Sequence, residues 1–224
     1  VTTIRRLHKA GLPLTMTTVA QAARVSRSWL YRQPDLHLEI ARHRHPAPTL
    51  PRAERASSGL GRARGGDLLG GTGHRRVDDP ASVTQVIRGV MAKLKTDAGV
   101  EWLALSSVAA GADLLFAQVA IELEFGWEAI LPLPSAEFRK DFSTEEWVGV
   151  ESLLTQAEHV RTISERGRRE DAYLDGGMET VNQCDLLLAV WDGEPSRGRG
   201  GTAEIVAYAR ALNRPLIIID AKTL

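Results

Sequence analysis

Apolar and polar positions follow one another in blocks along most of the chain, and the blocks have the lengths of strands and helices. Short apolar runs bounded by Gly, Pro or Asp predict strands, whereas apolar residues spaced by three and four predict helices. Repeated strand–helix units with apolar strands indicate an α/β fold, a parallel sheet covered by helices on both faces. The predicted strands are residues 67–71, 102–106, 129–133, 159–163, 185–191 and 215–220. The predicted helices are one from Pro80 with apolar residues through Leu94, 114–123, one after Ser143 with apolar residues through Leu154, 169–182 and 202–212.

Two of these helices have marked beginnings. Asp79 and Pro80 occupy N-cap and first-turn positions, and Ser143 with Glu146 forms a capping box. Helix 114–123 is apolar all round, which is typical of a buried helix, so we expect it at the centre of the domain.

The first strand has an unusual composition. Its sequence, Gly-Gly-Asp-Leu-Leu-Gly-Gly, lacks the β-branched residues expected of a core strand, and glycine weakens strand interiors. Two explanations remain open: the preceding linker extends into this strand, or the strand is compromised in a recombined chain.

Three loops follow strands of the predicted sheet, and each has the composition of an anion site. They are Gly71 to Arg75, Ser106 to Asp113 and Asp192 to Thr202. The carboxyl ends of parallel strands share one edge, where helix N-termini present free N–H groups to a phosphate. We therefore expect a nucleotide phosphate on the helix that begins near Thr202. The alternative for this stretch is a Gly-rich surface loop with a solvated Glu204.

Four stretches together resemble the SLOG superfamily, over most of residues 67–224. They are GTGHRRVDDP, ALSSVAAGADLLFAQVAIEL, ILPLPSAEFRKDF and CDLLLAVWDGEPSRGRGGTAE. This Rossmann-like group includes the LOG phosphoribohydrolases, the DNA-processing A proteins and nucleotide-sensing domains of bacterial conflict systems. LOG enzymes carry Pro-Gly-Gly-x-Gly-Thr-x-x-Glu with a catalytic Glu. The segment from Gly200 to Glu204 is one residue shorter and lacks the Pro.

The resemblance and the loops together predict a module that binds a nucleotide or an ADP-ribose-like ligand. Backbone or hydroxyl contacts to phosphate are expected from Gly73, Gly111, Gly200, Gly201 and Thr202. His74, Arg75 and Ser106 are expected to add side-chain donors, and Asp113 or Asp192 to accept from ribose hydroxyls. The plainer interpretations are a solvated turn at His74 and Arg75 and a simple N-cap at Asp113.

Two other functions fit the same residues. The first is an enzyme that cleaves the N-glycosidic bond of a nucleoside monophosphate, with Glu204 or Asp113 stabilising an oxocarbenium-like centre and Arg75 holding the phosphate. The second is a DNA-binding protein that retains the nucleotide fold without a ligand.

The N-terminal part has a different pattern. Residues 2–40 predict two or three short helices, with Thr18 and Ser26 as N-caps and a tight turn at Arg24-Val25. This is the pattern of a helix-turn-helix, and it resembles the DNA-binding segment of small transposition-associated accessory proteins. Such turns usually hold Gly where this chain has Arg24. DNA contacts are expected from Arg27, Ser28 and Arg32, and the alternative is a basic helical hairpin without a DNA function.

Charge divides the chain in two. Residues 1–76 carry 14 Lys/Arg against 4 Asp/Glu, whereas residues 77–224 carry 14 against 24, so two parts with different partners are expected. Residues 41–66 are rich in Arg, Pro and Gly and predict a basic linker between a DNA-binding segment (1–40) and the nucleotide-binding domain (67–224).

Composition limits the remaining possibilities. One cysteine excludes an internal disulfide framework and a zinc-binding Cys cluster, and His43 and His45 lack supporting ligands, so neither a metal nor a cofactor is expected. No apolar run approaches the ~20 residues that cross a bilayer, which predicts a cytoplasmic protein with no membrane partner. We also expect the chain to form a homo-oligomer.

Overall fold

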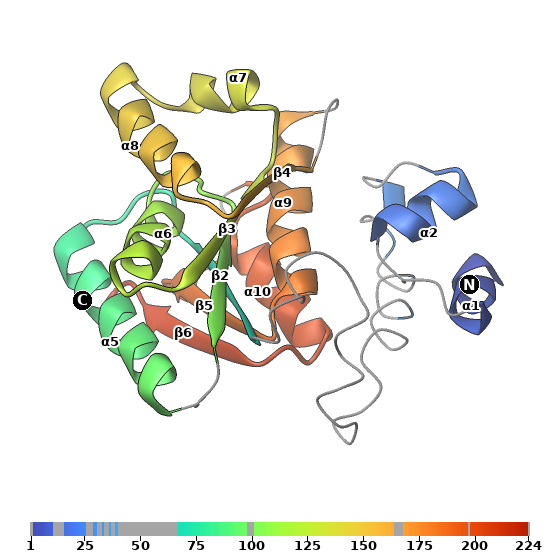
Figure 1. The fold of residues 1–224 in the computed structure, drawn as a ribbon, viewed down its shortest axis with the longest axis horizontal. Helices are drawn as coiled ribbons and strands as arrows, with labels where there is room; N and C mark the ends of the chain where they lie inside the picture. The colour runs from blue at the N-terminus through green and yellow to red at the C-terminus, as the bar shows by residue number, and fades with distance from the viewer. Residues whose placement is uncertain are drawn as a thin grey trace. The chain divides into compact units, whose positions relative to one another are not determined.

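Six parallel strands form one sheet in the order β4-β3-β2-β1-β5-β6 (Figure 1). Every neighbouring pair is parallel, which confirms the α/β fold expected from the alternation of strands and helices. The strands are β1 (Asp67–Gly73), β2 (Trp102–Ser106), β3 (Gly126–Leu131), β4 (His159–Thr162), β5 (Leu186–Trp191) and β6 (Leu216–Asp220).

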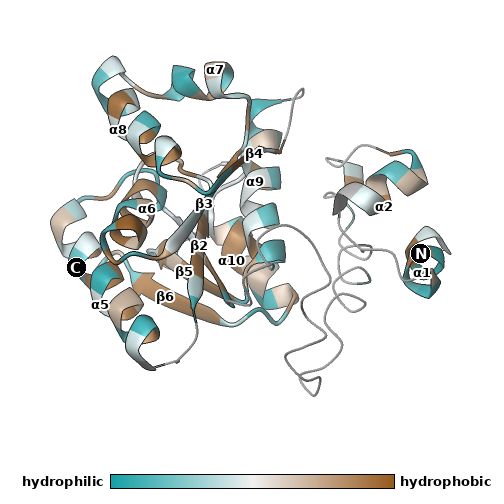
Figure 2. Cartoon of the chain, viewed as in Figure 1, coloured by the Kyte–Doolittle hydropathy of each residue, from teal (hydrophilic) through white to brown (hydrophobic). Residues whose placement is uncertain are grey.

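Helices cover both faces of this sheet (Figure 1). One core cluster joins the strands mainly to three helices on one face and also includes Ala172 and Tyr173 from the other face. A second cluster joins the strands to two helices on that other face. Figure 2 shows brown, apolar strands and teal positions along the outer sides of the helices. The first face carries α5 (Pro80–Asp97), α6 (Ala112–Glu122) and α8 (Thr144–Thr155); the second carries α9 (Arg169–Gln183) and α10 (Thr202–Ala211). Two short helical segments, α7 (Ser135–Phe138) and η3 (Arg139–Asp141), precede α8.

The structure, a computed structural model, falls into two compact units, Val1–Gly65 and Gly66–Leu224, and each is described by itself. No helix among the described residues is long and apolar enough to cross a membrane. The structure describes residues 2–10, 16–25, 29–30, 33, 36, 39, 67–97, 101–163, 168–196 and 198–223.

The helix starts agree with the sequence signals. The backbone N–H of Ser82 donates to Asp79 Oδ1 at 3.0 Å, which caps α5. Ser143 and Glu146 form the predicted capping box at α8: the N–H of Glu146 donates to Ser143 Oγ at 3.2 Å, and the N–H of Ser143 donates to Glu146 Oε2 at 2.7 Å.

The third strand differs from its prediction, because β3 begins at Gly126 and includes the charged Glu128. Glu128 is buried, and its Oε1 lies 3.3 Å from His159 Nδ1 on the adjacent strand. A cross-strand partner therefore allows a carboxyl within a core strand, where a polarity pattern predicts a loop.

β1 lies at the centre of the sheet, between β2 and β5, and extends two residues beyond its predicted end. Glycine is required here because α6 packs closely on the strand. A Cβ at Gly71 would lie 2.3 Å from the Phe116 ring, and a Cβ at Gly73 would lie 2.5 Å from Ala112 Cβ. The sequence argument against this strand was wrong because it considered strand propensity without the helix that covers the strand.

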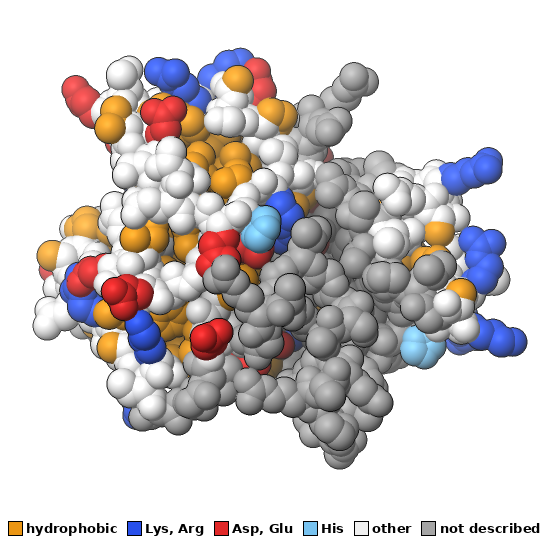
Figure 3. Space-filling model, viewed as in Figure 1, with side chains coloured by type: hydrophobic (Ala, Val, Ile, Leu, Met, Phe, Trp, Pro, Cys, Tyr) orange, Lys and Arg blue, Asp and Glu red, His pale blue; other side chains and the backbone are white. Residues whose placement is uncertain are grey.

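The N-terminal unit contains α1 (Thr2–Lys9) and α2 (Met16–Ala23). Since α2 begins at Met16, Thr18 lies within the helix and is not its N-cap. Arg24, directly after α2, has φ 54°, the conformation in which helix-turn-helix turns commonly use Gly. Figure 3 shows Lys and Arg side chains standing out from this unit. Arg27, Ser28, Arg32 and the linker residues 41–66 lie outside the described residues.

Replacing Gly71 by Ala is expected to lower the free energy of unfolding by about 1–3 kcal/mol, because the new methyl group overlaps the Phe116 ring. Urea unfolding followed by circular dichroism measures the change. Gly89→Ala in α5 is the matched control: no atom lies within 4 Å of the new Cβ, and we expect about 0.5–1 kcal/mol of stabilisation. A Gly71→Ala protein as stable as the parent would contradict the close packing.

Candidate functional site

The site lies where the strand order reverses, between β1 and β5. The chain after β1 turns toward β2, and the chain after β5 turns toward β6, so the two loops diverge at the point where open α/β sheets generally form a crevice. In open α/β sheets ligands bind outside the carboxyl ends of strands at such a point. The loops from His74 to Asp79 and from Asp192 to Gly201 therefore frame the candidate site.

His74 joins these two loops. Its backbone N–H donates to the Val190 carbonyl at 3.2 Å, which extends the β1–β5 pairing by one residue. Its Nε2 accepts from the Asp192 N–H at 3.0 Å and lies 2.9 Å from Asp192 Oδ1. A neutral imidazole with its hydrogen on Nδ1 makes the first contact, and a protonated imidazole donates to the carboxylate, so the loops are tied together in either state.

Asp192 also orders its own loop. Its Oδ1 accepts from the Glu194 N–H at 3.0 Å. This hydrogen bond is the main reason why the pKa of Asp192 lies below its ordinary value, with His74 as a smaller cause. Asp192 therefore acts as an anion that holds the loop, and part of its acceptor capacity is already used.

The start of α6, at Gly111 and Ala112, packs closely against the loop after β1. Gly111 has φ 87°, and a Cβ there would lie 2.3 Å from the His74 carbonyl oxygen and 2.6 Å from the Arg75 carbonyl carbon. The N–H of Ala112 donates to the His74 carbonyl at 3.0 Å. The first turn of α6 thus supports the loop from beneath, and glycine is needed at 111 for the close approach.

Asp113 is a buried carboxyl beside the end of β1. Its side-chain Oδ1 accepts from the Gly73 N–H at 3.0 Å, so that this N–H is engaged within the chain. Burial raises the pKa of Asp113 to about 7, although the N–H groups of Gly73 and Ala109 and the charge of Arg75 act in the opposite direction.

Ser106 shapes the loop between β2 and α6. It is fully buried, its Oγ accepts from the Val108 N–H at 3.2 Å, and its hydroxyl lies 3.4 Å from the Asp113 carbonyl oxygen. The same loop holds Val108 at φ 54°, a costly conformation for a β-branched residue. The hydroxyl expected to meet a ligand is thus bonded inside the loop.

The β5–α10 loop ends in a tight turn. Gly200 has φ 76°, and its N–H donates to Glu204 Oε2 at 2.5 Å. This contact is a helix-capping interaction, in which the carboxylate of the first turn reaches back to an N–H before the helix. A Cβ at Gly201 would lie 2.1 Å from Ser196 Oγ, so this glycine faces its own loop.

Thr202 is the first residue of α10 and is 6% exposed. Its hydroxyl makes no hydrogen bond within the part of the chain that the structure describes. The N–H groups of Thr202 and Ala203 belong to the first turn, where a helix offers them no partner. The start of α10 therefore combines free backbone donors with an unbonded hydroxyl.

The sequence analysis missed a network at the start of α9. Arg75 lies with its guanidinium 3.9 Å above the Tyr173 ring, and the Tyr173 hydroxyl bonds to Asp141. Asp141 also pairs with Arg169 at 2.7 Å. Burial and the bond to Asp141 raise the pKa of Tyr173, which stays protonated. The sequence could have predicted part of this network. Because α9 follows β4, its first turns must lie at the carboxyl ends of the strands, near the loop after β1.

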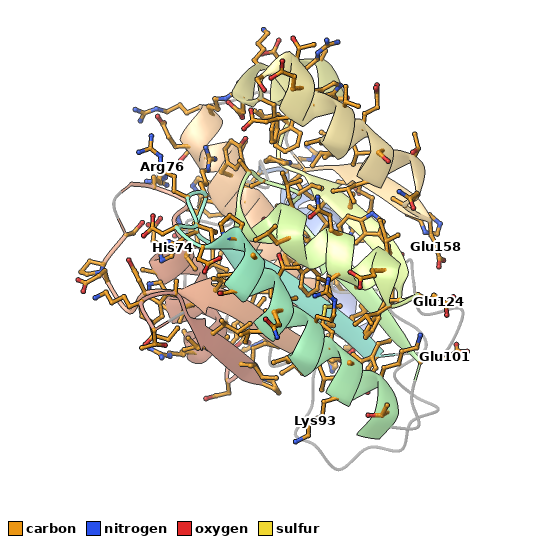
Figure 4. All side chains as sticks on the ribbon, turned by 90° about the vertical axis from the view of Figure 1, so that its left-hand side faces the viewer. His74, Arg76, Lys93, Glu101, Glu124 and Glu158 are labelled. Carbon is orange, nitrogen blue, oxygen red and sulfur yellow. The ribbon has the colours of Figure 1, made fainter. Side chains whose placement is uncertain are left out.

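Three glutamates lie on the side of the domain away from the candidate site. Figure 4 shows His74 and Arg76 on one side of the domain and Glu101, Glu124 and Glu158 on the opposite side. The three glutamates stand at or just before the amino ends of β2, β3 and β4. The candidate site therefore lies away from these three glutamates, although its own loops also carry Asp78, Asp79 and Asp192.

The topology and the loops define a Rossmann-like α/β domain. A similar solved structure is DNA processing protein A from Streptococcus pneumoniae, with a TM-score of 0.50 and 12% sequence identity. The match covers 96% of this chain and 79% of that chain, and at this identity it shows the fold alone. No protein-family model and no curated protein matches the chain.

Asp113→Asn is expected to change how stability depends on pH. The carboxyl has a higher pKa in the folded protein (about 7) than in the unfolded chain (3.8), so the native state binds the extra proton between these values. Stability from this group is therefore greatest at low pH and is lost as pH rises through about 7. Between pH 5 and pH 8 the parent should lose on the order of 2–3 kcal/mol that Asp113→Asn retains.

Urea unfolding of both proteins at pH 5 and pH 8 measures this difference. The buried Glu128, whose pKa is also raised, contributes equally to both proteins and cancels in the comparison. An equal loss of stability in the two proteins would show that Asp113 does not hold a proton near neutrality.

Proposed function

We propose that this chain binds a nucleotide or a nucleotide derivative such as ADP-ribose in the crevice between the β1 and β5 loops. The observation that carries the proposal is the reversal of strand order at β1 and β5, with both following loops tied together by His74 and Asp192. A ligand there meets a crevice whose two walls are already ordered, which reduces the entropy cost of binding.

The phosphate is proposed to bind at the start of α10. Thr202 supports this position, because the residue is 6% exposed, its hydroxyl makes no hydrogen bond among the described residues, and the adjacent N–H groups of the first turn are oriented along the helix axis. Arg75 and Arg76, both exposed, add positive charge from the opposite loop. Gly200 and Gly201 keep side chains away from the backbone at the turn.

The remaining predicted residues are proposed to act indirectly. The polar groups of Gly73, Ser106 and Asp113 are engaged within the chain, and Gly111 lies against the His74–Arg75 backbone. These residues hold the β1 loop in place. Asp192, whose carboxylate lies in the loop after β5, is proposed to accept from the ribose hydroxyls.

Binding is favoured over hydrolysis by the positions of the two candidate carboxylates. Glu204 caps the Gly200 N–H, and Asp113 is buried beneath the loop with its Oδ1 on Gly73. The observation in favour of a hydrolase is the pKa of Asp113 near 7, which suits proton transfer at neutral pH. The nucleoside-monophosphate hydrolase therefore remains the second candidate.

Thr202→Val is the sharpest test of the phosphate position, because it removes the hydroxyl and keeps the shape of the side chain. We expect it to weaken binding of AMP or ADP-ribose, measured by isothermal titration calorimetry, about tenfold. Arg75→Gln should weaken binding by a similar factor. Gly201→Val is less suitable, since its Cβ would displace Ser196.

Lys93→Gln is the control, because Lys93 is exposed on α5 and the substitution removes a positive charge far from the proposed site. Unchanged affinity in both Thr202→Val and Arg75→Gln would place the phosphate elsewhere. Glu204→Gln separates the two functions: a binding module should keep its affinity within about tenfold, whereas a hydrolase that uses this carboxylate should lose most of its turnover and release no free base.

We further propose that the N-terminal segment binds duplex DNA. Residues 1–76 carry 14 Lys/Arg against 4 Asp/Glu, and this positive charge supports DNA binding. The fold similarity to a protein whose name denotes DNA processing also supports it. Arg27→Ala with Arg32→Ala should weaken duplex binding and reduce the slope of log K against log salt by about 2. Fluorescence anisotropy over a salt series measures both, and no change in either would contradict this part of the proposal.

A further inference from the structure

The outer face of α1 carries a dense set of positive charges. Arg5, Arg6, His8 and Lys9 are all exposed, and the helix contains no acidic residue. Arg5 and Lys9 are separated by four positions and therefore project from the same side of the helix, one turn apart. Three permanent cations thus lie within a helix of eight residues.

Like charges at this spacing repel one another and weaken an isolated helix. The acidic group that the structure places near them is Glu39, whose Oε1 lies 3.8 Å from Arg5 Nε, while the Arg5 side chain remains 71% exposed. Among the described residues no other ion pair is seen for Arg5, Arg6 or Lys9, so most of their positive charge is not compensated there. A partner with regularly repeated negative charges would relieve the repulsion along the whole face.

The apolar side of α1 is not available to a partner. Ile4 is 1% exposed and Leu7 is 7% exposed, so both are packed inside the protein. An amphipathic helix that binds a membrane surface must insert such residues among the lipids. The exposed residues of α1 are instead polar or cationic, which fits a polyanion in water better than a lipid surface.

We propose that Arg5, Arg6 and Lys9 bind the phosphate backbone of duplex DNA, as a contact independent of base sequence and separate from Arg27 and Arg32. The inference rests on the DNA-binding part of the proposed function and adds a second set of residues to it. These three cations neutralise phosphates and so release condensed counterions. Contacts to the base edges are left to the segment after Arg24.

The test uses the full chain with Arg5→Gln, Arg6→Gln and Lys9→Gln combined. Glutamine keeps helix propensity and polarity while removing the charge. We expect the slope of log K against log salt to fall by about 2–3, since each phosphate contact contributes about 0.9. Affinity should fall at least tenfold in about 0.1 M salt, and by the same factor for duplexes of unrelated sequence.

Two further variants control for folding and for net charge. Arg5→Lys, Arg6→Lys and Lys9→Arg combined keep every charge and should keep the parent slope. Arg88→Gln, Lys93→Gln and Lys95→Gln combined remove three charges from α5 in the other unit and should leave the slope within about 0.5 of the parent. Circular dichroism confirms that each variant retains its helix content.

The outcomes distinguish a failure of this inference from a failure of the DNA-binding proposal on which it rests. If the α1 variant binds duplex DNA as the parent does while Arg27→Ala with Arg32→Ala loses binding, the α1 inference is overturned and the DNA-binding proposal stands. If neither variant changes binding, both are overturned. If the α1 variant loses affinity for anionic vesicles or single-stranded RNA but not for duplex DNA, the face serves another partner and the inference is overturned.

Discussion

The close packing of α6 on β1 is the constraint on which the rest of the domain depends. Phe116 lies where a side chain at residue 71 would lie, and Ala112 meets residue 73 in the same way. Glycine at these two positions lets a helix approach the central strand more closely than any larger residue allows. The glycines of the strand have no side chains to pack, and side chains of the helix fill that space instead.

This packing also positions the loops at the carboxyl edge. Because the first turn of α6 contacts the end of β1, Ala112 and Asp113 bond to His74 and Gly73, and the β1 loop leaves the sheet in one direction. His74 then reaches Asp192 on the far side of the crevice. The geometry of the candidate site is therefore a consequence of core packing, transmitted through three successive hydrogen bonds.

The net charge of residues 77–224 does not by itself describe the charges at the candidate site. Residues 77–224 carry 24 acidic against 14 basic residues, which by itself disfavours an anionic ligand. Figure 4 shows that Glu101, Glu124 and Glu158 lie on the side of the domain opposite His74 and Arg76, so part of this negative charge is away from the candidate site. Solvent and salt screen these three glutamates from the site, whereas Asp78, Asp79 and Asp192 lie in the site loops together with Arg75 and Arg76.

The sequence by itself determined the fold class, most element positions and the three loops at the carboxyl edge, because hydrophobic periodicity and capping signals are local properties of the chain. The tertiary structure decided the rest. It placed the glycine-rich β1 at the centre of the sheet, allowed Glu128 within a core strand and brought Tyr173, Asp141 and Arg169 beside Arg75. It also determined which polar groups are engaged inside the chain, as for Ser106 and Glu204. These properties depend on contacts between residues far apart in the sequence, which no local pattern records.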